Sequence, residues 1–250
     1  MNHQAFARAL EFSQDTLERV RWNLVTEFKH DPIAMLLAAY RVPRRFHHTI
    51  DHPTQMIIQA NELDYFEDLL DDTMFDALIW SIWFHDCVYN VMVRDNELQS
   101  AKMFKAIFTA LNMDPVLVED IFETIEMTAA ATPESLELVR KDKIGAILHD
   151  LNYGIIGSDE HSYGRYAHNI ASEWIPAVGV DAFLKGRLKF LDGLRRNING
   201  LFFTEQMIRF TDQAASNIDR EIQMHRDYVN KFGTEDPDLV PLTGRISSSL

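Results

Sequence analysis

Apolar side chains recur at helical spacing along most of this chain. Near the N-terminus they fall at Phe6, Leu10, Leu17, Val20 and Leu24, so that they share one face of a helix. Strand-like alternation with turn dipeptides is scarce by comparison. The pattern therefore predicts a fold that is nearly all α.

Proline, glycine and residues typical of helix ends interrupt the helical pattern. Such interruptions indicate where one helix stops and the next begins, and they divide the chain into about eight to ten helices. The expected breaks are at Asp31-Pro32, around Pro43, at Asp71-Asp72-Thr73, over residues 112–115, at Thr132-Pro133 and over residues 157–160.

Length and composition fit a single helical domain followed by a short tail. A chain of 250 residues, 46% of them hydrophobic, is long enough to bury one large core, and it shows no internal repeat. Periodicity stops near the C-terminus, where Pro237, Pro241 and three consecutive serines occur. We expect one helical bundle over residues 1–232 and an irregular tail over residues 233–250.

The charge of the chain limits its partners. A formal net charge of −14 argues against non-specific binding of nucleic acid, because phosphate backbones repel a negative surface. An anionic ligand would need a local cationic patch. Arg41, Arg44 and Arg45 form one candidate, since guanidinium groups bind phosphate in a bidentate manner. The alternative is that this run is an ordinary solvated loop.

Nothing in the sequence predicts secretion or insertion into a membrane. The first residues lack the basic start and the apolar core of a secretory signal, and Cys87 has no partner for an intrachain disulfide. The most apolar run, residues 74–89, is interrupted by Asp76, His85 and Asp86 and is too short to cross a bilayer. We expect a cytoplasmic protein, and the sequence leaves a homo-oligomer open.

The apolar run over residues 74–89 predicts a core helix with an unusual end. It is apolar around most of its circumference, yet His85 and Asp86 lie near its C-terminus. An ionised carboxylate that is removed from water needs a cation or several hydrogen-bond donors. A bound metal would supply that cation. The alternative is that the helix end has already reached solvent.

Two further segments carry residues of the type that bind metals. His48 and His52 are four positions apart, and Pro53 predicts a helix that starts near Asp51 or His52, with Asp51 as its cap. Farther along, a second apolar helical stretch ends in Asp150.

A histidine, a His-Asp pair and a distant Asp in this order resemble the HD superfamily of metal-dependent phosphohydrolases, named for that dipeptide. The matching residues here are His52, His85, Asp86 and Asp150. The likeness extends to predicted HD-type phosphohydrolases with Arg-x-Tyr-His-x-x-x-His, His-Asp-x-x-Tyr, Asn-Glu-x-x-Ser-Ala and Asp-Leu-glycine elements. These correspond to residues 45–52, 85–89, 96–101 and 150–157.

The sequence departs from that family pattern at three places. His47 stands where tyrosine is usual, Met127 stands where a histidine is expected, and Ala171 replaces an arginine ahead of Glu173. None of these changes removes a predicted metal ligand. They do bear on whether the activity of other members extends to this chain.

The resemblance implies an all-α HD-domain bundle with a metal site in its core. His52, His85, Asp86 and Asp150 would hold a divalent ion, which the donor types allow to be Mn, Fe, Co, Ni, Zn or Mg. A similar histidine pair in cyclic-nucleotide phosphodiesterases implies that His52 is a ligand and His48 the general acid. In the competing assignment His48 is the ligand and His52 is structural.

The same resemblance implies roles around the metal. Such an ion lowers the pKa of a bound water to about 7, which favours hydrolysis at phosphorus. Arg44 and Arg45 would bind the phosphate, Asn96 would contact substrate, and Glu97 would orient the attacking water. Asn96 and Glu97 have a plainer reading as a helix cap and a solvated side chain. Tyr163, Tyr166 and Glu173 are candidates for packing or for the pocket.

The function expected from the sequence is hydrolysis of a phosphomonoester or phosphodiester of a nucleotide or another small phosphorylated metabolite. One alternative is a metal-binding sensor or scaffold of the same fold that turns nothing over, which Met127 and Ala171 favour. Another is a di-iron oxygenase, which would need extra histidines between Asp86 and Asp150. His149 is the only histidine in that interval.

Overall fold

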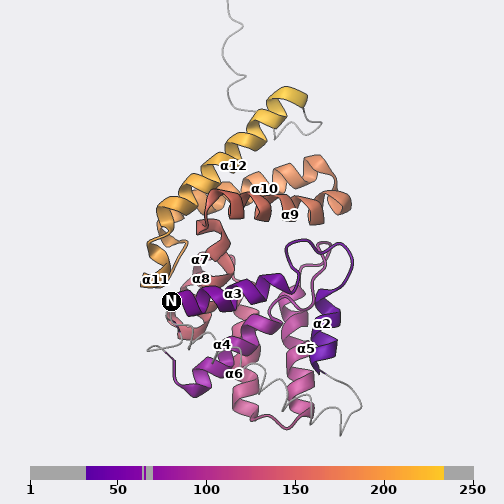
Figure 1. Cartoon of the computed structure of the whole chain (residues 1–250), viewed down its shortest axis with the longest axis vertical. Coiled ribbons are helices and arrows are strands. Elements are labelled where there is room, and N and C mark those ends of the chain that lie inside the picture. Colours follow the sequence, from indigo (N-terminus) through magenta and orange to yellow (C-terminus); the bar gives the residue numbers. More distant parts are fainter. Residues whose placement is uncertain (1–31, 64, 66–69, 234–250) are drawn as a thin grey trace, which may run out of the picture. The chain divides into compact units, whose positions relative to one another are not determined.

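The computed structural model of this chain is all helical over the residues that it describes, 32–63, 65 and 70–233. These residues form eleven α-helices and two short 3-10 helices and contain no strand (Figure 1). The all-α prediction is confirmed, with slightly more helices than the eight to ten expected. The helical pattern from Phe6 to Leu24 and residues 234–250 of the predicted tail lie outside the described residues.

Contacts divide the chain into two compact units, and the boundary along the sequence falls between Asn152 and Tyr153. The prediction of one domain over residues 1–232 stays a prediction. The first unit contains α2 (Pro32–Tyr40), α3 (Asp51–Glu62), α4 (Asp72–Phe84), α5 (Asn96–Ala110), α6 (Pro115–Met127), α7 (Pro133–Lys141) and α8 (Lys143–Tyr153).

The helix starts of the first unit follow from local chemistry. Pro32, Pro115 and Pro133 each stand at the start of a helix, where the missing N–H of proline costs no hydrogen bond. Asp114 caps α6 by accepting hydrogen bonds from two backbone N–H groups, and Thr132 forms a capping box with Ser135 at α7. These starts coincide with the breaks that the sequence predicts.

An aromatic cluster forms the core of the first unit. Trp80 and Phe84 of α4 pack against Phe104 and Phe108 of α5, with ring centroids 4.6 Å apart for Trp80 and Phe108. Ile121 of α6 lies in the same cluster, and Figure 1 shows α5 beside α6. Because Phe84 is the last residue of α4, this packing fixes the position at which the chain leaves the helix.

The apolar run over residues 74–89 is helical only up to Phe84. The backbone N–H of His85 still donates to the carbonyl of Ser81, and that of Cys87 donates to Phe84 in a tighter turn. His85 and Asp86 therefore stand at the point where the helix changes into a turn, and both are buried. None of the helices that the structure describes combines the length and apolarity needed to cross a bilayer.

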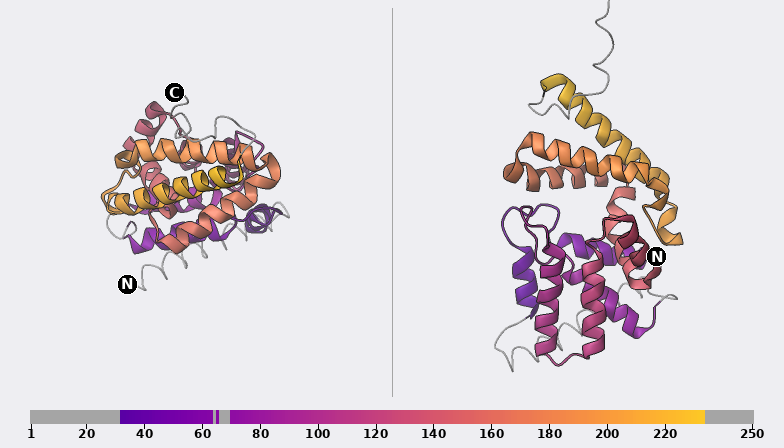
Figure 2. Two further views of the ribbon diagram at one scale, coloured as in Figure 1. Left: turned by 90° about the horizontal axis from the view of Figure 1, so that it is seen from above. Right: turned by 180° about the vertical axis from the view of Figure 1, so that it is seen from behind.

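The second unit is a separate group of helices. It contains η1 (Gly154–Gly157), α9 (Glu160–Val178), α10 (Val180–Arg196), η2 (Ile198–Gly200), α11 (Glu205–Ile208) and α12 (Thr211–Phe232). The helices α9, α10 and α12 pack on one another, as the orange and yellow ribbons of Figure 2 show. Asn217 of α12 ties down η1 by donating hydrogen bonds to the carbonyls of Ile156 and Ser158.

A buried polar network holds α9, α10 and α12 together. Arg187 pairs with Glu221 through two hydrogen bonds of 2.7 and 3.0 Å and donates a third to the hydroxyl of Tyr166. Tyr163 and His225 donate to the same carboxylate. Burial alone would raise the pKa of Glu221, but the bonds from His225 and Arg187 lower it to about 2. Tyr163 and Tyr166 therefore take part in this network, and the choice between a packing and a pocket role stays open.

We expect Arg187→Met to destabilise the protein strongly. The substitution leaves the Glu221 carboxylate buried without its main partner, which typically costs about 3–5 kcal/mol of unfolding free energy. Urea unfolding followed by circular dichroism would measure this. The matched control is Arg195→Met, because Arg195 pairs with Asp219 on the surface, where an ion pair adds little to stability, and we expect a much smaller loss. Equal losses for both variants would contradict this account of the network.

Candidate metal centre

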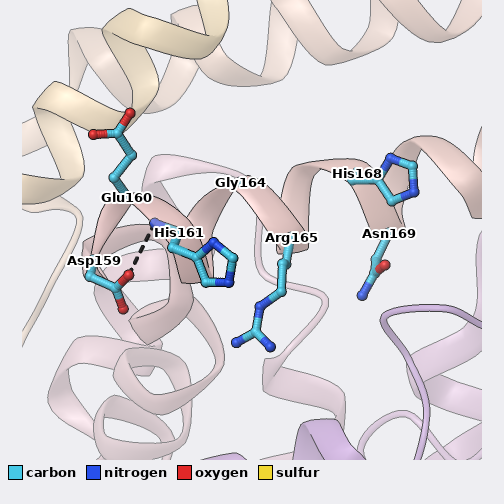
Figure 3. A pocket seen from close by; sticks show the side chains of 7 residues that line it. All are labelled: Asp159, Glu160, His161, Gly164, Arg165, His168 and Asn169. Carbon is cyan, nitrogen blue, oxygen red and sulfur yellow. Dashed lines mark hydrogen bonds between the residues drawn. The ribbon is translucent and has the colours of Figure 1, made fainter.

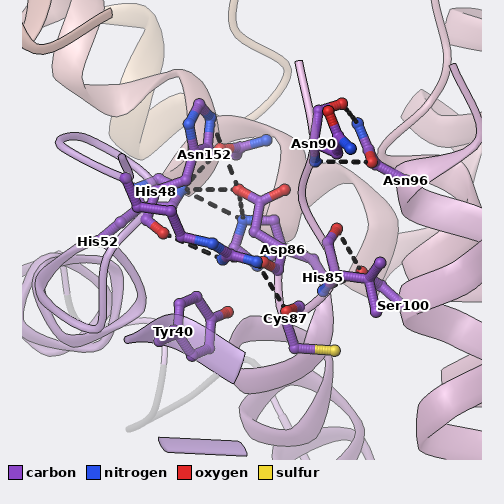
Figure 4. A network of polar contacts seen from close by, with 12 residues as sticks. Tyr40, His48, His52, His85, Asp86, Cys87, Asn90, Asn96, Ser100 and Asn152 are labelled. Carbon is purple, nitrogen blue, oxygen red and sulfur yellow. Dashed lines mark hydrogen bonds and ion pairs between the residues drawn. The ribbon is translucent and has the colours of Figure 1, made fainter. Parts of the chain in front are cut away.

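Three side chains of metal-binding type converge where α3 begins and α4 ends (Figure 4). The Nε2 atoms of His52 and His85 are 3.2 Å apart, and Oδ2 of Asp86 is 3.1 Å from His85 Nε2 and 3.5 Å from His52 Nε2. Ligand atoms that share one ion at about 2.1 Å lie about 3.0 to 3.4 Å from one another. The three atoms therefore have the spacing of ligands around one metal ion.

The start of α3 places His52 in this group. His52 is the second residue of the helix, next to Pro53, and both are buried. The helix begins at Asp51 as expected, but Asp51 is not the cap. The preceding Ile50 already has helical backbone angles, so the chain enters α3 without the extended residue that a capping side chain requires.

The orientation of His85 suits metal binding. Its Nδ1 lies 2.9 Å from the carbonyl oxygen of Ile82. A carbonyl oxygen only accepts hydrogen bonds, so in the neutral ring Nδ1 carries the proton and Nε2 presents its lone pair toward His52 and Asp86. The side chain of His85 is fully buried, which keeps the ring in this orientation.

The charges in this group are strongly coupled. Burial would raise the pKa of Asp86, but the imidazoles of His85 and His48 outweigh burial and hold the pKa well below its usual range. Burial lowers the pKa of His52 to about 3, with a further contribution from His85. Burial would also lower the pKa of His85, yet the Asp86 carboxylate raises it above the ordinary value. The site therefore combines an ionised carboxylate with a neutral His52.

Asn152 is a member of this neighbourhood that the sequence did not predict. Its Oδ1 lies 3.1 Å from Nε2 of His52, and Figure 4 shows the amide beside Asp86. Asp150, the predicted fourth ligand, is completely buried in the same helix, α8. Within the described residues, the group of mutually close ligand atoms comprises His52, His85 and Asp86. The role of Asp150 as a ligand stays a prediction.

His48 lies at the edge of the group. Its Nε2 is 3.9 Å from Oδ2 of Asp86, and its ring stacks on Tyr89 with centroids 3.8 Å apart. His52, in contrast, lies within 3.5 Å of both other members of the group. The geometry favours His52 over His48 as the ligand. His48 is partly exposed, and its role as general acid stays a prediction.

The Asn-Glu-x-x-Ser-Ala element supports the chain that follows the His-Asp pair. Asn96 accepts a hydrogen bond from the backbone N–H of Asn90 and donates to the carbonyls of Asn90 and Val93. Ser100 accepts from the N–H of Val88 and donates to its carbonyl. The Asn96 side chain thus has a structural role in the loop, and its predicted contact with substrate stays a prediction.

Glu97 is half-buried at the start of α5. Its charge contributes to the raised pKa of His85, so it lies close enough to interact electrostatically with the group formed by His52, His85 and Asp86.

The three arginines of residues 41–45 differ from one another in exposure. Arg41 and Arg44 are exposed, whereas the guanidinium of Arg45 donates hydrogen bonds to backbone carbonyls, including that of Asp86.

The departure from the family pattern at Met127 has a local explanation. A side-chain carbon on Gly145 would lie 2.9 Å from the sulfur of Met127. The methionine therefore occupies space that a glycine on α8 leaves open, and it packs the end of α6 against the helix that carries Asp150. Nothing in the structure explains Ala171.

The second unit carries a surface hollow along α9. It is lined by Asp159, Glu160, His161, Gly164, Arg165, His168 and Asn169 (Figure 3). Asp159 accepts hydrogen bonds from the backbone N–H groups of His161 and Ser162, so its carboxylate caps α9. The hollow contains none of the residues that the motifs single out.

Comparison with known proteins adds no family to this picture. The chain matches no protein-family model, no curated protein and no solved structure. The resemblance to the HD superfamily therefore rests on the motifs, and the structure adds the convergence of His52, His85 and Asp86.

We expect metal binding at this site to release a proton, and the number released should approach about one as the pH falls below the raised pKa of His85. His52, with a pKa of about 3, is neutral over most of the pH range, whereas the raised pKa of His85 means that a metal competes with a proton for its imidazole. Affinity should therefore fall on acidification, approaching about tenfold per pH unit below the pKa of His85. Calorimetric titration with Zn²⁺ in buffers of different ionisation enthalpy would count the protons.

The control for this experiment is His161→Asn, which alters an exposed histidine on α9 and should leave the proton count unchanged. A zinc affinity that does not vary with pH between about 5 and 7 would contradict the account, because imidazole ligands compete with protons over that interval.

Proposed function

We propose that this protein is a metal-dependent phosphohydrolase of the HD type, acting on a phosphomonoester or phosphodiester of a nucleotide or another small phosphorylated metabolite. The observation that carries the proposal is the convergence of His52 Nε2, His85 Nε2 and Asp86 Oδ2 within 3.5 Å of one another. Residues 33 positions apart meet here, on the two segments whose motifs resemble that family.

The donor set fits a divalent metal ion. It joins two imidazole nitrogens to a carboxylate oxygen, and it is nearly removed from water, so a cation would offset the cost of burying the charge of Asp86. Nitrogen and oxygen donors suit Mn, Fe, Co, Ni, Zn and Mg. An ion with open coordination positions would polarise the phosphoryl group and activate a water. Asp150, and the amide oxygen of Asn152, are candidates to complete the set.

The residues around the donor set have separate tasks in this proposal. His48, partly exposed and stacked on Tyr89, donates a proton to the leaving oxygen. Glu97 orients the attacking water. Arg44, whose side chain is exposed beside this loop, neutralises phosphate charge.

One observation favours the alternative of a metal-binding sensor or scaffold. The side chains of Arg45 and Asn96, both predicted to contact substrate, are engaged with backbone groups of their own loops. A site with fewer groups directed at substrate suits binding better than turnover.

The test compares wild type with Asp86→Ala. We expect purified wild type to hold metal and to hydrolyse members of a nucleotide and phosphoester panel when Mn²⁺, Mg²⁺, Co²⁺, Ni²⁺ or Zn²⁺ is added. Asp86→Ala should lose metal and at least about 100-fold in turnover, because it removes a ligand rather than a supporting residue. Metal analysis provides one measurement, and chromatography of the reaction products provides the other, because hydrolysis of a diester releases no inorganic phosphate.

The matched control is Glu123→Ala, which removes an exposed carboxylate from α6 and should behave as wild type. Near-stoichiometric metal that Asp86→Ala loses, together with an inactive wild type, would favour the sensor. Absence of metal binding in wild type would show that the site assignment is wrong.

A further inference from the structure

The guanidinium of Arg45 connects the two segments that carry the metal-type residues. Nη1 donates to the backbone carbonyl of His48 at 3.1 Å and to that of Asp86 at 2.8 Å, and Nη2 donates to the carbonyl of Cys87 at 2.9 Å. His48 belongs to the loop before α3, whereas Asp86 and Cys87 belong to the turn after α4. One side chain thus links backbone positions 38 and 39 residues apart.

Two tyrosines enclose this guanidinium. Its central carbon lies 5.4 Å from the ring centroid of Tyr40 and 5.7 Å from that of Tyr89, within the range of cation–π attraction. Tyr40 is itself buried and donates a hydrogen bond to the carbonyl of Trp83 in α4. The Nε atom of Arg45 is also buried. Three of the five N–H donors of this guanidinium therefore bind backbone carbonyls and the Nε–H is buried, which leaves little of the group for a phosphate.

The backbone in front of Arg45 is strained. Arg44 has φ of +74°, a left-handed conformation that costs a residue other than glycine about 1 kcal/mol or more. This turn leaves the Arg44 side chain exposed while the next side chain enters the protein. A conformation of this cost persists when surrounding contacts stabilise it, and the three hydrogen bonds of Arg45 do so.

We propose that Arg45 is a positioning residue of the metal centre and not a phosphate-binding residue. It fixes the backbone of Asp86, whose carboxylate joins the ligand group, and the backbone of His48, whose ring borders it. The inference rests on the proposed function only in requiring that a metal binds at His52, His85 and Asp86. It changes the role that the sequence predicts for Arg45 and leaves Arg44 as the exposed cation of the run.

The test measures metal affinity with no substrate present. Chelator competition would give the dissociation constant for Co²⁺ in wild type, Arg45→Gln and Arg45→Lys, and the visible absorption of bound Co²⁺ would report ligand geometry. We expect Arg45→Gln to weaken Co²⁺ binding about 10- to 100-fold, the loss typical of residues that orient metal ligands, and to change the spectrum. Arg45→Lys should recover little, because an ammonium group lacks the planar fork that reaches several carbonyls.

The control is Arg94→Gln, which removes an exposed arginine from the loop after the His-Asp turn and should bind Co²⁺ as wild type does. Circular dichroism of each apoprotein shows whether it is folded, and Arg45→Lys keeps the charge and the stem if Arg45→Gln fails to fold. Wild-type Co²⁺ affinity in a folded Arg45 variant would overturn the inference, and so would a variant that keeps this affinity but loses affinity for inorganic phosphate. No binding in wild type would instead overturn the proposed function.

Discussion

A carboxylate that is nearly removed from water has to be stabilised by its surroundings, and in this protein Asp86 is that group. It stands just beyond an apolar helix whose last turns are locked in an aromatic core, so it cannot move out to solvent. The imidazoles of His52 and His85 lie within 3.5 Å of its Oδ2 atom. Arg45 donates a hydrogen bond to the backbone carbonyl of the same residue. Placing these groups determines the course of the chain before α3 and after α4.

The motif residues divide into two kinds once the structure is considered. His52, His85 and Asp86 direct ligand-type atoms at one point. Asn96 and Ser100 use their side chains on backbone groups of the turn and loop after the His-Asp pair. A sequence pattern does not separate the two kinds, because both require a particular residue type at a particular place. The geometry separates them, because the side chain of a structural residue such as Asn96 forms its hydrogen bonds with the backbone of the protein itself.

Those parts of the structure that depend on neighbouring residues could be predicted from the sequence. Pro115 and Pro133 each begin a helix because proline and the capping residue before it act within one turn. The pairing of Arg187 with Glu221 could not be predicted, since it joins residues 34 positions apart. Arginine and glutamate are also residue types that usually lie on the surface. Asn152 was missed for a related reason. An amide carries no charge that would mark it as unusual in a helical sequence.

The single cysteine of the chain lies next to the site. Cys87 follows Asp86 directly, and a thiolate there would be a soft ligand and a target for oxidants. Burial raises the pKa of this thiol to about 11, and its sulfur lies 3.8 Å from that of Met103 on the side of the aromatic core. The sulfur therefore stays protonated and shielded. The atoms that converge at the site are therefore nitrogen and oxygen, even though a sulfur atom belongs to the very next residue.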